Sequence, residues 1–135
     1  MAIDPGSKRV GLALSDETRT IASPYRTLPA EPAESLVDRL VATLREAGAG
    51  RLVVGLPKNM DGSSGPQVKA ARLLAERLRV ASGLPVEMID ERLSSAAAER
   101  HLIDGGMRRD KRKQVVDQVA ATLLLQGWLE SHRAL

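Results

Sequence analysis

The sequence contains no cysteine and no phenylalanine, and Tyr25 and Trp128 are its only aromatic residues. Without cysteine the chain can form no disulfide, no thiolate nucleophile and no thiolate zinc site. Proteins that read single-stranded nucleic acid by its bases usually stack those bases on several aromatic rings. Any contact with nucleic acid is therefore expected to depend mainly on its backbone and shape.

Long apolar runs are also missing. No stretch approaches the length of a membrane span, and the N-terminal residues reach Asp4 and a Pro-Gly turn before the apolar core of a signal peptide could form. We therefore expect a cytoplasmic protein that does not associate with membranes. The length of 135 residues is that of one domain, residues 1–135.

The positive charge is concentrated in one short segment. Residues 108–113 carry five basic side chains and one acidic one, a net charge of +4, whereas the whole chain carries +3. The rest of the chain therefore has a net charge of −1. Such a cluster indicates a contact with a polyanion, although a solvated loop is the common alternative.

The hydrophobic pattern predicts a mixed α/β fold. Apolar residues alternate along residues 10–15, as in a strand with one buried face, and recur at helical spacing along residues 32–47. The same reasoning predicts strands at residues 1–3, 10–15, 21–28, 51–54 and 85–90, and helices at residues 32–47, 66–80, 94–105 and 114–130. A meander followed by alternating strands and helices implies a mixed five-stranded sheet flanked by helices.

Three acidic positions stand out within these elements. Asp4 ends the first strand, Asp90 and Glu91 close the last one, and Asp117 lies in the last helix. Strand ends and an inward helix face could gather these carboxylates, and oxygen ligands suit two Mg²⁺ or Mn²⁺ ions. Taken singly, Asp4 could instead form a turn, Glu91 could pair with Arg92, and Asp117 could interact with the helix dipole.

The last helix offers two apolar rows. One consists of residues 116, 120, 123 and 127, and the other contains Asp117 together with residues 121, 124 and 128. A carboxylate on a buried flank is costly unless it is paired or bound to a cation.

Four segments of the chain, in order and at full-domain length, resemble one known family. They are residues 2–16 (AIDPGSKRVGLALSD), 53–63 (VVGLPKNMDGS), 90–95 (DERLSS) and 112–121 (RKQVVDQVAA). The family is YqgF, also called RuvX, whose members are described both as pre-16S rRNA nucleases and as Holliday junction resolvases.

The resemblance implies an RNase H-like fold in which Asp4, Glu91 and Asp117 are the catalytic, metal-binding acids. It favours Glu91 over Asp90, a choice that strand alternation leaves open. It also implies a divalent-metal-dependent nuclease, acting in 5′-end processing of pre-16S rRNA or on branched DNA. A two-fold junction as substrate would favour a homodimer. A nucleic-acid-binding module without catalysis is the remaining alternative.

Several basic and polar residues are candidates for binding structured RNA or branched DNA. Lys8 and Arg9 follow Asp4, and Lys58 and Asn59 lie in a central loop, where a turn and a helix cap are the alternative interpretation. The segment before the last helix contributes Arg108, Arg109, Lys111, Arg112 and Lys113.

Overall fold

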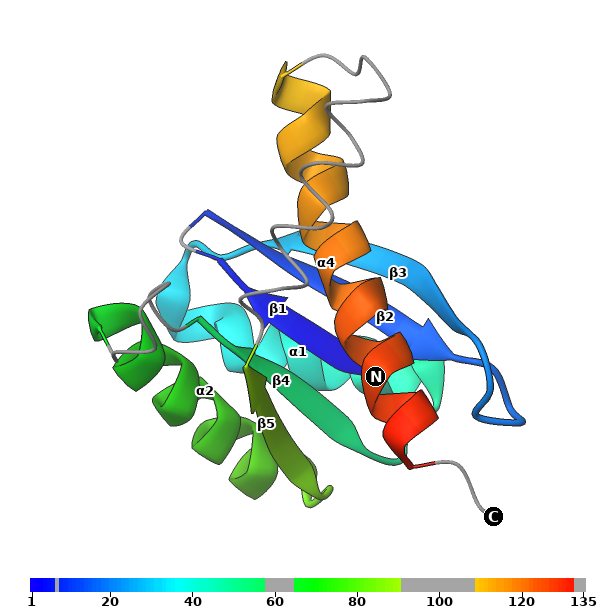
Figure 1. Ribbon diagram of the computed structural model, residues 1–135. Coiled ribbons are helices and arrows are strands. Elements are labelled where there is room, and N and C mark those ends of the chain that lie inside the picture. The colour runs from blue at the N-terminus through cyan, green and yellow to red at the C-terminus, as the bar shows by residue number, and fades with distance from the viewer. Residues whose placement is uncertain (7, 58–64, 91–108, 133–135) are drawn as a thin grey trace.

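The computed structural model describes residues 1–6, 8–57, 65–90 and 109–132, with only the backbone described for 109–117. Five strands form one sheet: β1 (Ala2–Pro5), β2 (Arg9–Ser15), β3 (Ala22–Pro29), β4 (Leu52–Leu56) and β5 (Val86–Asp90). Their order across the sheet is β3-β2-β1-β4-β5 (Figure 1). β1, β2 and β3 pair antiparallel, whereas β1, β4 and β5 pair parallel. The prediction of a mixed five-stranded sheet is confirmed.

Helices cover both faces of this sheet. α1 (Ala33–Ala47) lies behind it in Figure 1, α2 (Pro66–Ser82) lies at its lower left beside β4 and β5, and α4 (Arg109–Ser131) crosses its front. We call these the α1/α2 face and the α4 face. Ile3, Leu12 and Val54 pack with the two helices on the α1/α2 face. Ala2, Ala13 and Val53 pack with α4 on the other.

Local sequence explains most of these elements. All five residues of β4 are buried, as expected of an apolar parallel strand covered on both faces. Pro66 occupies the first turn of α2, where its missing N–H costs nothing. Gly48 and Gly83 end α1 and α2 with φ angles of 73° and 72°, a left-handed conformation that favours glycine.

The start of the last helix was predicted wrongly. α4 begins at Arg109 and includes most of the basic segment, which the sequence analysis placed before a helix at residue 114. Arginine and lysine are good helix formers, and Asp110 near the N-terminus complements the helix dipole. The helix predicted at residues 94–105 lies outside the described residues. None of the described helices combines the length and the apolar character that crossing a membrane requires.

Candidate functional site

Asp4 lies in β1, at the centre of the sheet, and its relative exposure is only 7%. Its partner in register on β2 is Gly11. On the other side Ile3 pairs with Val54, so the next position along this parallel pair sets Asp4 beside Gly55. Both cross-strand neighbours of Asp4 are therefore glycines, and neither adjacent strand places a side chain directly beside its carboxylate.

The carboxylate of Asp4 belongs to the α4 face. Successive residues of a strand point to opposite faces. Ala2 packs against α4 and Ile3 packs on the α1/α2 face, so Asp4 shares the face of Ala2. A carboxylate buried to this extent is stable only with hydrogen-bond donors or a cation close to it.

β5 presents its two acidic residues to opposite faces. Glu87 accepts a hydrogen bond from the indole Nε1 of Trp128 on α4, and Ile89 packs in the same cluster. Met88 packs on the α1/α2 face, and alternation gives Asp90 the face of Met88. Asp90, which is exposed, therefore lies on the face opposite Asp4. Glu91 lies outside the described residues.

The buried face of helix α4 follows one of its two predicted apolar rows, and of the other row only Ala120 is buried among the residues with described side chains. Ala121 and Leu124 are buried against the sheet, whereas Leu123 is 40% exposed and Gly127 is exposed. The row of residues 116, 120, 123 and 127 is therefore not the centre of the buried face. Position 117 precedes Ala121 by four residues and Leu124 by seven, so its backbone lies on the sheet-facing row.

Two glutamines attach α4 to the sheet. The Nε2 of Gln118 donates to the Oγ1 of Thr27 on β3, at 2.7 Å. Two turns later, the Oε1 of Gln126 accepts from the backbone N–H of Ala22 at 2.8 Å, and its Nε2 donates to the carbonyl of Thr20. Neither glutamine could be predicted from the sequence, because their partners lie about a hundred residues away.

Thr27 belongs to the same row of the sheet as Asp4. Thr27 pairs with Gly11 on β2, and Gly11 pairs with Asp4 on β1. The hydrogen bond of Gln118 therefore attaches α4 to the row Thr27–Gly11–Asp4. Gln118 is the residue that directly follows position 117.

The predicted nucleic-acid-binding residues fall into three groups. Lys8 is exposed and Arg9 is half-buried, and both follow the turn after Asp4, where the N–H of Gly6 donates to the carbonyl of Arg9 at 2.9 Å. Lys58, Asn59 and Arg108 lie outside the described residues. The remaining residues are in the first two turns of α4, where only the backbone is described: Arg109, Lys111, Arg112 and Lys113.

Within the described residues, no three histidine or acidic side chains come together as a metal site. Of the three predicted ligands, only Asp4 has a described side chain, and neither Glu91 nor the side chain of Asp117 can be compared with it. What the described part offers is a buried carboxylate, a hard oxygen donor of the class that Mg²⁺ and Mn²⁺ prefer.

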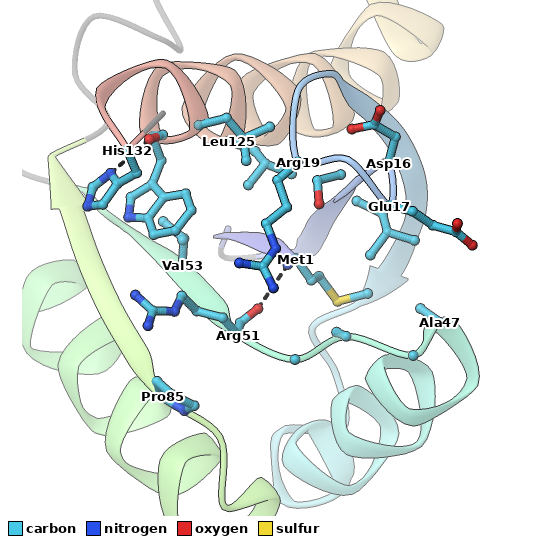
Figure 2. A pocket seen from close by; sticks show the side chains of 17 residues that line it. Met1, Asp16, Glu17, Arg19, Ala47, Arg51, Val53, Pro85, Leu125 and His132 are labelled. Carbon is cyan, nitrogen blue, oxygen red and sulfur yellow. Dashed lines mark hydrogen bonds between the residues drawn. The ribbon is translucent and has the colours of Figure 1, made fainter. Parts of the chain in front are cut away.

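A separate cavity of about 980 Å³ opens at the opposite end of β1. Met1 lies in its wall, and Arg19 and Arg51 point into it (Figure 2). The ring of His132 stacks on Trp128 with centroids 4.1 Å apart, and the Arg51 guanidinium lies 5.6 Å from the centroid of Trp128. Asp16 and Glu17 also line it, so the rim mixes both signs of charge. No sequence pattern predicts this cavity, because its walls come from distant segments.

Comparison with known proteins identifies relatives along the whole chain. The family model described as "RuvX: Holliday junction resolvase" matches residues 1–131. Curated relatives named "Putative pre-16S rRNA nuclease" include one from Chloroflexus aurantiacus, 42% identical over 99% of this chain and 88% of its own length. Another, from Moorella thermoacetica, is 44% identical over 96% of this chain and 93% of its own length.

Among solved structures, the chain is similar to Thermus thermophilus RuvC in complex with a Holliday junction substrate. The TM-score is 0.55 at 17% sequence identity, covering 96% of this chain and 92% of RuvC. At this identity the likeness concerns the fold alone, and it confirms the RNase H-like fold that the sequence predicted.

Proposed function

Because the chain belongs to the RuvX family, we propose that it is a divalent-metal-dependent nuclease that hydrolyses phosphodiester bonds in 5′-end processing of pre-16S rRNA. The names of relatives more than 40% identical over nearly the whole chain support this function. The observation that carries it is the burial of Asp4 on the α4 face, with a glycine on each adjacent strand. Residues 1–135 would form one nuclease domain, acting in the cytoplasm.

The metal site would consist of Asp4, Glu91 and Asp117. Asp90 occupies the face opposite Asp4, and strand alternation then favours its neighbour Glu91 as the ligand from this end of β5. The place of residue 117 on the sheet-facing row of α4 supports the third ligand. Two Mg²⁺ or Mn²⁺ ions held there would supply an activated water and stabilise the leaving oxygen of the phosphodiester.

The nucleic-acid backbone would contact basic residues near the proposed metal site. Lys8 and Arg9 lie next to Asp4 in the chain, and Lys58 and Asn59 follow β4. Arg109, Lys111, Arg112 and Lys113 are held by the first turns of α4, one to two turns before Asp117, and Arg108 directly precedes them. Contacts of this kind hold the phosphate backbone without reading sequence.

Resolution of Holliday junctions is the second candidate function, favoured by the description of the family model. The two-fold symmetry of such a junction would favour two active sites related by the same symmetry, and hence a homodimer. A nucleic-acid-binding module without catalysis would bind both substrates and cleave neither.

The test is to incubate the purified protein with Mn²⁺ and either a 16S rRNA precursor or a four-way DNA junction, in parallel. We expect cleavage of the precursor near its mature 5′ end, loss of cleavage with EDTA, and restoration by added Mn²⁺ or Mg²⁺. Cleavage of the junction alone would establish the second function. If wild type and Asp4→Asn are equally inactive on both substrates while wild type binds them, the protein is a binding module.

A further inference from the structure

The contact between α4 and the sheet is apolar, and Leu124, Leu125 and Leu129 of the helix pack in it beside small side chains. Ala120 and Ala121 of the helix are buried, and Ala2 and Ala13 lie beneath it. Apolar contact is not directional. The leucines begin seven residues after position 117, and the buried side chains described nearest to that position are only Ala120 and Ala121. Their methyl groups specify the axial position of this part of α4 only weakly.

The hydrogen bond from Gln118 to Thr27 adds a directional contact at the residue next to position 117. It is 2.7 Å long, half-buried, and joins residues 91 positions apart in the chain. Hydrogen bonds lose strength quickly as their length and angle depart from the optimum. Because one residue of helix rises 1.5 Å, a displacement of α4 by a single residue would break this bond.

The bond lies in the row of the sheet that also contains Asp4. Thr27, Gly11 and Asp4 are successive partners across β3, β2 and β1, and Gly11 adds no side chain between the other two. Residue 117 is the immediate neighbour of Gln118. The bond therefore controls the distance along the sheet between the backbone of residue 117 and Asp4.

We propose that Gln118 and Thr27 are positioning residues of the metal site, which set the location of Asp117 relative to Asp4. This inference rests on the proposed nuclease function. A functional constellation must be held to within about 0.5 Å of its productive geometry, less than one residue of helix rise. Residues that orient metal ligands typically change metal affinity by about 10–100-fold when they are replaced.

The experiment measures Mn²⁺ binding to the nucleic-acid-free protein by electron paramagnetic resonance, together with its thermal unfolding. Gln118→Met and Thr27→Val each remove the hydrogen bond while keeping the approximate side-chain volume. We expect each to weaken Mn²⁺ binding by about 10–100-fold, and the double variant to be no weaker than either single one. Cleavage by these variants should recover towards the wild-type kcat at high Mn²⁺ concentration.

Two controls separate positioning from general stability. Thr27→Ser keeps the hydroxyl and should retain wild-type Mn²⁺ affinity, even if Gln118→Met fails to fold. Gln126→Met removes the other attachment of α4, away from the row of Asp4, and should lower the unfolding temperature without changing Mn²⁺ affinity.

Wild-type Mn²⁺ affinity in Gln118→Met and Thr27→Val would overturn the positioning role and leave the proposed nuclease intact. An equal weakening of Mn²⁺ binding in Gln126→Met and Gln118→Met would also overturn it, since any loosening of α4 would then suffice. If wild type itself bound no Mn²⁺ and cleaved nothing, the proposed function would fail and this inference with it.

Discussion

Glu87 and Asp90 lie three residues apart on β5 and point to opposite faces of the sheet. Glu87 contacts Trp128 on the α4 face, and Asp90 shares the α1/α2 face with Met88. Asp90 and Glu91 are therefore not equivalent candidates, although they are adjacent and both acidic.

The first prediction concerns this pair. Glu91→Gln should abolish metal-dependent cleavage, whereas Asp90→Asn should retain more than half of the wild-type kcat. The reason is that alternation sets Asp90 on the face away from Asp4. Single-turnover cleavage at saturating Mn²⁺ provides the measurement. The reverse pattern would assign the ligand to Asp90 and would require a break in the alternation of β5.

The second prediction concerns the three carboxylates as a unit. Asp4→Asn and Asp117→Asn should each abolish cleavage, and the double variant should be little worse than either, because jointly acting groups are not additive. Near-normal turnover of Asp117→Asn would remove that residue from the site.

Stability without metal provides the third prediction. Asp117 would stand near two other carboxylates, and like charges at close range disfavour one another. Asp117→Asn should therefore raise the free energy of unfolding of the metal-free protein, by about 1 kcal/mol. Divalent metal should raise the Tm of wild type more than that of the variant. Destabilisation by the substitution would favour a helix-dipole or ion-pair role for Asp117.

The fourth prediction tests the basic start of α4. Replacing Arg108, Arg109 and Lys111 with Ala should weaken binding to RNA and DNA alike and leave kcat at saturating substrate unchanged. The slope of log affinity against log salt should become shallower by about 0.7–0.9 for each phosphate that is no longer bound. Alanine favours helix, so α4 should persist, and its helicity can be checked by circular dichroism. An unchanged salt slope would show that these residues are merely solvated.

The turn after Asp4 gives the fifth prediction. A Cβ on Gly6 would lie 2.5 Å from the carbonyl oxygen of Arg9, a backbone atom that cannot move aside, whereas a Cβ on Gly50 would meet nothing within 4 Å. Gly6→Ala should therefore lower the free energy of unfolding by about 1–3 kcal/mol, and Gly50→Ala should be close to neutral. Urea unfolding of both variants checks this, and equal stabilities would contradict it.

The sequence predicted the sheet and most of the helices because their signals are local: alternation in β2, an apolar run in β4, and glycine at the ends of α1 and α2. It misjudged the start of α4, where the charge of the segment suggested a loop although its residues favour helix. The sequence pattern predicts two apolar rows on that helix, and only packing against the sheet determines which of them forms most of the buried face.

The candidate site was predictable only in part. Asp4 stood out because it is an acid at the end of the first predicted strand, where acids are unusual, and its burial agrees with that signal. The face of Asp90 depended on what packs against Met88 and Ile89, which a single sequence does not reveal. The bond of Gln118 to Thr27 joins segments that meet only after folding, and no local sequence pattern predicts it.

The order of elements along the chain has a consequence for synthesis. Asp4 lies on β1, the first strand, and α4 follows all other described elements. β1, β2 and β3 can pair while still close to the ribosome, because their contacts are local. In a nascent chain, Asp4 can therefore be part of a paired sheet long before residue 117 has been translated. The proposed site cannot assemble until the last helix has left the exit tunnel, which would keep an unfinished chain from cutting the RNA around it.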